Sequence, residues 1–99
     1  MKEITISELI KIINDDINII DIRDNYQYNL GKIENSINIP MNFLLKNPSE
    51  YLNKDERYYI YCDYGNRSRK CTLLLSNEGY DVVNIKGGYN NYFLYSHHI

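Results

Sequence analysis

A cysteine near the middle of the chain, Cys62, occupies a position at which a protein can build a nucleophile. It follows Arg57 to Tyr61, a run of aromatic and β-branched residues that predicts a strand, and it precedes a polar loop that leads into a predicted helix. A thiol placed there faces free N–H groups at a helix N-terminus, whose partial positive charge stabilises an anion by about 0.3–1 kcal/mol. Such surroundings favour the thiolate, which is the nucleophilic form of cysteine.

The loop after Cys62 contains residue types suited to binding an oxyanion. Gly65 can adopt a positive φ and has no Cβ, so it lets the loop turn its amides inward as an anion-binding nest. Arg67 adds a planar donor set suited to a sulfonate-like group, and Ser68 is placed to cap the helix that follows. The sequence therefore predicts Cys62 as a catalytic nucleophile, with a substrate-binding loop made of Asp63, Tyr64, Gly65, Asn66, Arg67 and Ser68.

The same residues have simpler interpretations. Cys62 could be a buried strand residue that acts as a small hydrophobe, and Arg67 could be a solvated arginine in the first helical turn. A positive charge is unfavourable at a helix N-terminus, however, which argues for an anion beside Arg67. Cys71 is expected on the inward side of the helix, where core packing is the preferred interpretation and a resolving thiol the alternative.

The elements around Cys62 alternate between strand and helix. Strands are predicted around Ile4 and over residues 17–22, 36–39, 57–62 and 81–85. Helices are predicted over residues 8–13 with Ser7 as the cap, 26–30, 41–46, from Ser68 to a C-cap at Gly79, and 89–95. The residues predicted to face inward are Leu9, Ile10 and Ile13 in the first helix and Cys71, Leu74 and Leu75 in the fourth. This alternation predicts a parallel sheet covered by helices on both faces, with a ligand site beyond the C-terminal ends of the strands.

Composition limits the kind of protein. The 99 residues are enough for a single domain, residues 1–99, and the hydrophobic (43%) and charged (24%) fractions are those of a globular chain. Eleven Lys and Arg against thirteen Asp and Glu give a net charge of −2. That balance argues against nucleic acid as a partner, because nucleic-acid binders carry a basic face, and against a polybasic membrane signal.

The chain also shows no targeting or metal-binding pattern. No apolar run approaches the roughly 18 residues of a membrane span, and acidic residues near the N-terminus argue against a signal peptide. Two cysteines without such a signal predict free thiols in a reducing cytoplasm. His97 and His98 are expected in a frayed tail and do not form a zinc-ligand spacing with the cysteines, so no metal is predicted.

Residues 62–68 resemble the active-site loop of the rhodanese-like sulfurtransferases, Cys-x-x-Gly-x-Arg-Ser. Three further segments resemble that family in its order and spacing. They are residues 20–23 (Ile-Asp-Ile-Arg) with Tyr28, residues 31–40 from Gly-Lys-Ile to Asn-Ile-Pro, and residues 79–88 from Gly-Tyr to Gly-Gly. The sequence departs from the family at Lys32, where histidine is usual, at Tyr92, where tryptophan is frequent, and at Gln27, which is often glutamate.

The resemblance implies a rhodanese-like three-layer α/β fold, with a central parallel sheet of about five strands and helices on both faces. It implies a sulfurtransferase that moves sulfane sulfur from a donor such as thiosulfate to cyanide or a thiol through a persulfide on Cys62. Asp21 and Arg23 resemble residues that brace the site. No cofactor is implied, since the cysteine carries the sulfur, and the implied partners are small sulfur donors and acceptors or a sulfur-accepting protein.

Two alternative functions stay open beside sulfur transfer. Phosphatases and arsenate reductases of this fold place one residue more between cysteine and arginine than the four residues 63–66, so a narrower loop is expected here. A sulfur-relay or regulatory binding module is the second alternative, although many modules of that kind have lost the cysteine that this chain retains.

Charge predicts which donor is preferred. Asp63 formally offsets Arg67, and Arg69 and Lys70 diverge by about 100° on the helix, so they are not expected to face the site together. The sequence therefore predicts weak turnover of the doubly charged thiosulfate.

Overall fold

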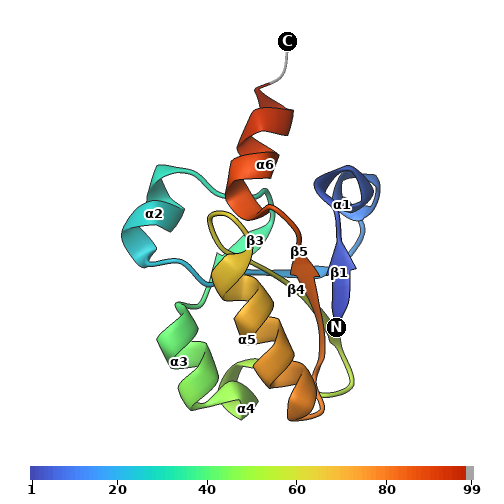
Figure 1. Ribbon diagram of the computed structural model, residues 1–99, viewed down its shortest axis with the longest axis vertical. Coiled ribbons are helices and arrows are strands. Elements are labelled where there is room, and N and C mark those ends of the chain that lie inside the picture. Colours follow the sequence, from blue (N-terminus) through green and yellow to red (C-terminus); the bar gives the residue numbers. More distant parts are fainter. Residues whose placement is uncertain (98–99) are drawn as a thin grey trace.

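The computed structural model describes residues 1–97 of the chain as a five-stranded parallel sheet with helices on both faces (Figure 1). The strands are β1 (Lys2–Ile4), β2 (Asn18–Asp21), β3 (Ser36–Asn38), β4 (Arg57–Tyr61) and β5 (Asp81–Ile85). The helices are α1 (Ile6–Ile12), α2 (Asn25–Leu30), α3 (Met41–Lys46), α4 (Pro48–Tyr51), α5 (Asn66–Asn77) and α6 (Gly88–Ser96). The strand order is β1-β5-β4-β2-β3, which puts the end of β4 at the centre of the sheet. The predicted α/β fold is confirmed.

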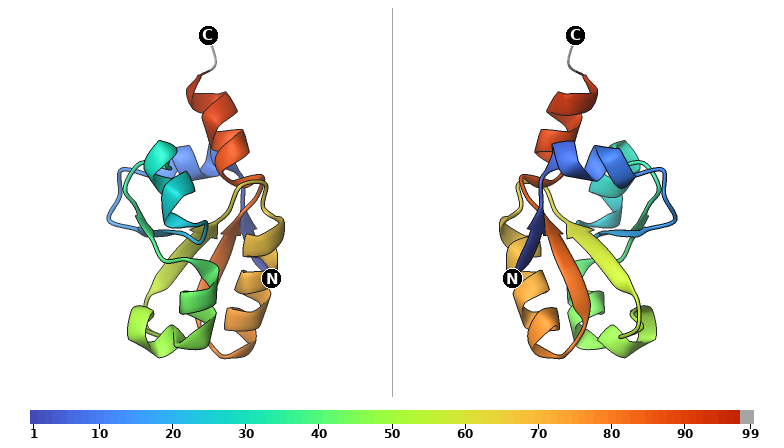
Figure 2. Two further views of the ribbon diagram at one scale, coloured as in Figure 1. Left: turned by 90° about the vertical axis from the view of Figure 1, so that its left-hand side faces the viewer. Right: turned by 90° about the vertical axis from the view of Figure 1, so that its right-hand side faces the viewer.

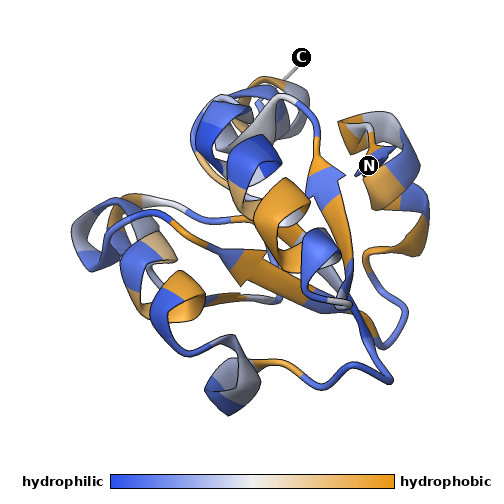
Figure 3. Cartoon of the chain, turned by 60° about the horizontal axis from the view of Figure 1, so that its bottom comes forward, coloured by the Kyte–Doolittle hydropathy of each residue, from blue (hydrophilic) through white to orange (hydrophobic). Residues whose placement is uncertain are grey.

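Two cores lie on opposite faces of the sheet. One core joins β4 and β5 to α3 and α5 and includes Leu44, Cys71 and Leu75, and the other joins the sheet to α1 and α6. Along β4, Tyr58 and Ile60 belong to the first core, as strand alternation requires. Figure 2 shows α3 and α5 apart from α1 and α6 in both views. Figure 3 shows apolar residues concentrated in the strands and hydrophilic residues in the connecting loops.

Helix α1 begins two residues before the predicted start, and its cap is Thr5, not Ser7. The Glu8 N–H donates to the Thr5 hydroxyl over 3.2 Å, and the Thr5 N–H donates to the Glu8 carboxylate over 2.9 Å. This reciprocal capping box satisfies two helix-end donors at once, so it outcompetes a cap at Ser7. Leu9 and Ile13 are buried as predicted, whereas Ile10 is half-buried.

Helix α5 begins at Asn66, with Gly65 as its N-cap, so the predicted cap at Ser68 is wrong. Ser68 lies inside the first turn and is buried, and Leu74, predicted to face inward, is 42% exposed. At the other end Gly79 follows the C-cap residue in a left-handed conformation, with φ of 96°. Its N–H donates to the Ser76 carbonyl, which completes the predicted glycine stop.

No helix within residues 1–97 is long and apolar enough to span a membrane. Helix α4 was not predicted from the sequence, because it is a single turn that starts at Pro48 directly after α3.

Candidate active site

Cys62 is the first residue after β4, and its thiol lies inside the loop that leads into α5. The side chain is buried, with 2% of its surface exposed. The backbone N–H groups of Gly65 and Ser68 both donate to Cys62 Sγ, each over 3.3 Å. Two amides directed at one sulfur at a helix N-terminus stabilise negative charge on that sulfur. The loop therefore has the geometry of a nest for a thiolate or a persulfide.

The loop keeps this shape because a second segment supports it from behind. The first amides of α6 are directed at the loop, so that the Tyr89 N–H donates to the Cys62 carbonyl over 2.8 Å and the Asn90 N–H to the Asp63 carbonyl over 2.9 Å. Gly65 has φ of 97°, and a Cβ on it would lie 3.0 Å from the Gly87 nitrogen. Only glycine fits a left-handed position this close to another backbone.

The Ser68 hydroxyl contacts the sulfur from the helix side. Its Oγ lies 3.4 Å from Cys62 Sγ and 2.6 Å from Asn84 Oδ1, to which it donates. The residue is fully buried. Ser68 therefore contacts the sulfur through both its side chain and its amide, whereas the sequence predicted it as a member of the substrate-binding loop and as a helix cap.

Asp63 holds the outer part of the loop. Its carboxylate accepts from the Gln27 amide over 3.0 Å and from Arg23 Nη1 over 3.4 Å, and it pairs with Arg67 Nη2 at 3.7 Å. The glutamine that departs from the family pattern therefore contacts the loop directly. Asp63 is engaged by three partners, so it shapes the loop and lowers its net charge.

Arg23 and Asp21 form a buried brace under the loop. Arg23 is 3% exposed, and its guanidinium donates to both Asp21 carboxylate oxygens and, over 2.6 Å, to the Gly31 carbonyl. The guanidinium carbon lies 4.4 Å from the centroid of the Tyr89 ring. Burial alone lowers the pKa of Arg23, but the hydrogen bonds and charge of Asp21 more than offset this effect and raise it above its ordinary value. Arg23 thus stays ionised and links β2, the α2 region and α6 behind Cys62.

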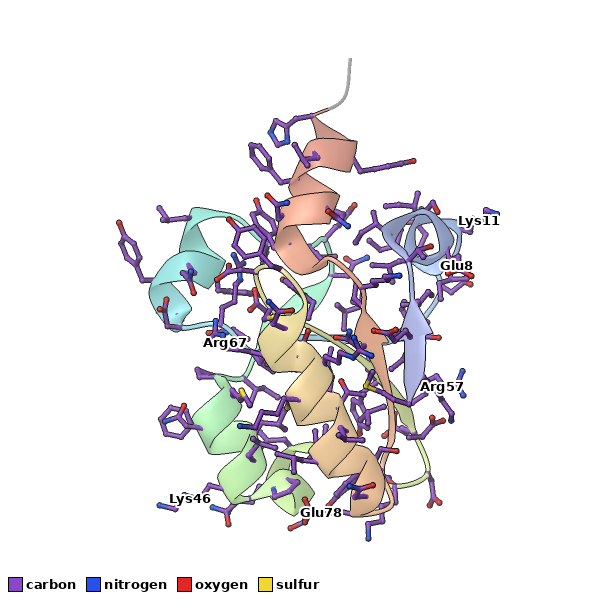
Figure 4. The ribbon with its side chains drawn as sticks, in the orientation of Figure 1. Glu8, Lys11, Lys46, Arg57, Arg67 and Glu78 are labelled. Atoms are coloured by element: carbon purple, nitrogen blue, oxygen red, sulfur yellow. The ribbon has the colours of Figure 1, made fainter. Side chains whose placement is uncertain are left out.

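Arg67 stands at the rim, with its side chain 53% exposed. Figure 4 shows it at the start of α5, on the side of α2 and α3. There it lines a hollow of about 390 Å³ whose other walls are Ile22, Asp24, Pro40, Met41, Asn42 and Leu45. The hollow is mainly apolar and contains one acidic and one basic side chain. Arg67 is the residue through which this hollow adjoins the loop.

The other predicted loop residues face different surfaces. Tyr64 is 68% exposed and lines a hollow of about 280 Å³ with Gln27, Asp63, Tyr89, Asn90 and Phe93. Asn66 lies with Arg69 and Lys70 in a third hollow beside Met1. The structure thus gathers Cys62, Gly65 and Ser68 around the sulfur and places Asp63 and Arg67 at the rim. The side chains of Tyr64 and Asn66 do not reach the sulfur.

Cys71 is a core residue. It is fully buried, and burial together with the nearby charge of Cys62 raises its pKa to about 12. Burial therefore disfavours the thiolate form of Cys71, which argues against a role as a resolving nucleophile. The predicted packing role of Cys71 is confirmed.

Sequence reasoning missed Asn84, which is 1% exposed and accepts from Ser68. The signal was an amide in the buried part of strand β5, between Val83 and Ile85, since a buried polar side chain needs a partner. Within residues 1–97 no group of three or more His, Cys, Asp or Glu side chains is arranged to hold a metal ion. His97 stacks on Phe93 at the end of α6, and His98 lies outside the described residues.

Comparison with known proteins defines the class. Residues 5–94 match the family described as Rhodanese-like domain, and the chain belongs to that family. The rhodanese-like domain protein of Staphylococcus aureus has a similar solved structure, with a TM-score of 0.84 and 35% sequence identity over 93% of this chain and 91% of that one.

Two curated relatives are larger proteins. The tRNA uridine(34) hydroxylase of Wolbachia sp. subsp. Brugia malayi (strain TRS) is 33% identical over 87 residues, which is 83% of this chain and 32% of the relative. The adenylyltransferase and sulfurtransferase UBA4 of Vanderwaltozyma polyspora is 32% identical over 85 residues, which is 75% of this chain and 20% of the relative. The chain thus spans a third or less of these relatives. The family includes sulfurtransferases, which supports a transferase at that coarse level.

Proposed function

We propose that the protein is a sulfurtransferase that carries sulfane sulfur as a persulfide on Cys62. The observation that supports this function best is the position of Cys62 Sγ, with the Gly65 and Ser68 amides each 3.3 Å away. These donors stabilise negative charge on sulfur, both in the Cys62 thiolate and in the persulfide.

The proposed cycle has two half-reactions. In the first, the Cys62 thiolate attacks the outer sulfur of a donor such as thiosulfate, a new S–S bond forms, and the old S–S bond breaks with its electron pair leaving on sulfite. In the second, cyanide or a thiolate attacks the terminal sulfur, and the electron pair of the persulfide bond returns to Cys62. Each step moves an electron pair between sulfur and a nucleophile, so the cycle uses no cofactor.

The charges at the rim favour a donor with low net charge. Arg67 is the only basic residue among the described walls of its hollow, where Asp24 also lies, and it is paired with Asp63. A dianion such as thiosulfate therefore meets two carboxylates and one half-exposed guanidinium. We propose that thiosulfate is used weakly and that a persulfide or another low-charge donor is used better.

The persulfide can be tested by mass spectrometry of protein treated with thiosulfate and with a low-molecular-weight persulfide. We expect one added sulfur on the peptide that contains Cys62, with release of that sulfur by cyanide. Cys62→Ala should abolish the addition, and Cys71→Ala, the matched control, should retain it because Cys71 is in the core. A wild-type protein that stays unmodified across several donors would contradict the proposal.

A phosphatase or arsenate reductase function is less well supported. Four residues separate Cys62 from Arg67, and Arg67 is directed to Asp63 and the rim hollow. A tetrahedral phosphoryl or arsenate group needs a wider loop with the arginine facing it. We therefore expect negligible hydrolysis of para-nitrophenyl phosphate, and turnover that depends on Cys62 would reverse this ranking.

Sulfur relay to a protein acceptor is the second candidate, and the exposed aromatic side chains beside the loop favour it. Tyr64 and Phe93 are 68% and 43% exposed and line the same hollow. A pull-down that compares persulfidated with reduced protein distinguishes a sulfur relay from a free-standing sulfurtransferase. A relay should retain an acceptor protein that takes the sulfur, and the Tyr64→Ala variant should no longer retain that protein. We also propose a reducing, cytoplasmic setting, because both cysteines are free thiols.

A further inference from the structure

A line of hydrogen bonds continues from the Cys62 sulfur to the edge of the sheet. Ser68 Oγ lies 3.4 Å from Cys62 Sγ and donates to Asn84 Oδ1 over 2.6 Å, and Asn84 Nδ2 donates to Glu3 Oε2 over 3.0 Å. Glu3 and Asn84 are Cα partners in the neighbouring parallel strands β1 and β5, so their side chains share a face of the sheet. Ser68 and Asn84 are buried, whereas Glu3 is exposed.

The direction of these hydrogen bonds follows from Glu3. A carboxylate only accepts, so the Asn84 amide turns its NH₂ group toward Glu3 and its oxygen toward Ser68. That oxygen also only accepts, and at 2.6 Å it lies closer to Ser68 Oγ than the Gly65 carbonyl does at 3.2 Å. The single hydroxyl proton of Ser68 is therefore directed to Asn84 and not to Cys62. Ser68 Oγ then presents lone pairs to the sulfur and accepts the thiol proton, an arrangement that favours the neutral thiol.

We propose that Glu3 and Asn84 are positioning residues that restrain the Ser68 hydroxyl from donating to the Cys62 sulfur. When the sulfur becomes negative, the hydroxyl must turn away from Asn84 Oδ1, and that buried oxygen then lacks a donor. Without the Glu3 carboxylate the amide is free to rotate, and without Asn84 Oδ1 the Ser68 hydroxyl loses its nearest acceptor and keeps only the Gly65 carbonyl, 3.2 Å away. In either variant only the longer contact to the Gly65 carbonyl competes with a negative sulfur, so Ser68 donates to that sulfur and Cys62 becomes more reactive. The inference deepens the proposed function, since it concerns the same sulfur.

Most other charges near the line are paired or lie on the far side of the loop, and Arg69 and Lys70 of α5 line a hollow with Met1, two residues before Glu3. Asp63, Arg23, Asp21 and Arg67 form the network at the outer side of the loop, and Cys71 faces the sulfur from α5. Lys2, Glu8 and Arg57 line the same surface hollow as Glu3, but Lys2 and Arg57 pair with Asp81 and Glu8 caps α1. Within residues 1–97 Glu3 makes no ion pair within 4.0 Å. Loss of the Glu3 charge also favours a negative sulfur by Coulomb's law, so the test must separate charge from hydroxyl orientation.

The test measures the rate at which iodoacetamide alkylates Cys62, with the modified peptide identified by mass spectrometry. Glu3→Leu and Asn84→Leu are each compared in the wild-type and in the Ser68→Ala background. At about pH 6.5 we expect each single variant to react about tenfold faster than wild type, which corresponds to ~1.4 kcal/mol. At about pH 10, where a free thiol is ionised, the rates should converge to within about twofold.

In the Ser68→Ala background the acceleration should disappear, because no hydroxyl remains to be redirected. Glu8→Gln, which removes a carboxylate from the same hollow without touching the line, should keep the wild-type rate. Unchanged rates in both Leu variants would overturn the proposal, and so would an acceleration that persists in the Ser68→Ala background. Glu3→Leu changes an exposed side chain, so this variant by itself tests the proposal if Asn84→Leu does not fold. No sulfur donor is used, so failure here is distinct from failure of sulfur transfer.

Discussion

Gly88 lies directly against the carbonyl group of Cys62, so that a Cβ atom on Gly88 would overlap the Cys62 oxygen and stand 2.9 Å from the Asp63 carbonyl carbon. The contact joins two segments that are more than twenty residues apart in the sequence. It brings the first amides of α6 to the Cys62 and Asp63 carbonyls, and the loop can then direct its own Gly65 and Ser68 amides to the sulfur. The glycine pair after β5 is therefore part of the support of the nucleophile.

Gly88→Ala should destabilise the protein and open the loop. The new methyl group meets backbone atoms that cannot move aside, and φ of 58° adds the strain of a left-handed alanine. Overpacking and strain together predict a loss of about 2–4 kcal/mol in the free energy of unfolding. Gly79→Ala is the matched control, because φ there is 96° but the nearest atom is the flexible Lys54 Nζ at 3.6 Å. Its loss should be about 1 kcal/mol, and equal losses in urea denaturation would contradict this account.

Arg23→Lys should be strongly destabilising although it keeps the charge. The guanidinium holds both Asp21 oxygens, the Gly31 carbonyl and the Tyr89 ring at once, and an ammonium cannot reproduce this planar set of donors. We expect about 2–4 kcal/mol from the buried groups left without partners. Arg57→Lys, at a half-exposed ion pair with Asp81, serves as the control and should cost less than about 1 kcal/mol. Similar urea midpoints for the two variants would show that Arg23 acts through its charge alone.

Asp81 should contribute to stability in a pH-dependent way. A hydrogen bond from Lys2, aided by Arg57, lowers the pKa of Asp81 below its usual value. A carboxyl whose folded pKa is lowered adds stability above its ordinary pKa, and this contribution is lost as the pH falls through the folded pKa. The group is about a third exposed, so screening by water limits the effect to less than about 1 kcal/mol.

The measurement for Asp81 is urea denaturation of the wild type and of Asp81→Asn at two pH values. At about pH 7 the variant should be less stable, and at an acidic pH below the folded pKa of Asp81 the difference should vanish because the wild-type carboxyl is then protonated as well. High salt should reduce the difference at about pH 7. If the stability difference between wild type and Asp81→Asn grows as the pH falls, the ion pairs of Asp81 are not its cause.

The sheet and its helices were predictable because hydrophobic periodicity and turn residues are local in the sequence. The runs around Ile20, Ile60 and Val83 each form a buried strand, and the glycine stop at Gly79 ends α5 as expected. Helix starts were less predictable. The N-cap of α5 is Gly65, which has no side chain to cap with, so Ser68 offered a stronger but incorrect signal.

The site could be predicted only as far as its residues are adjacent in the chain. Cys62, Gly65 and Ser68 lie within seven positions, and the structure brings them together around the sulfur. Asn84 reaches Ser68 only because β5 lies beside β4 in the sheet, a pairing that no local pattern specifies. The same reason explains why the orientation of the Ser68 hydroxyl could not be foreseen.

Arg67→Ala should impair thiosulfate turnover more than turnover of a low-charge persulfide. Arg67 is the one basic residue among the described walls of its hollow, and without it a dianion faces Asp24 and Asp63 with only the buried Arg23 to offset them. We expect kcat/KM for thiosulfate to fall about tenfold or more, the loss of one oxyanion clamp, while the nucleophile stays in place. For the persulfide the change should stay within about threefold. Added salt should raise the KM of the wild type for thiosulfate, because it screens the attraction of the exposed guanidinium.

The matched control for Arg67 is Arg69→Ala, which removes the same charge from the same helix. Arg69 lines a different hollow with Met1 and Leu73, so its loss should change the overall field but not the contact with donor. We expect kcat/KM for both donors to stay near the wild-type value in Arg69→Ala. If Arg67→Ala lowers kcat/KM equally for both donors, Arg67 does not recognise the charge of the donor. It would then act by shaping the loop through its pairing with Asp63, which lies 3.7 Å away.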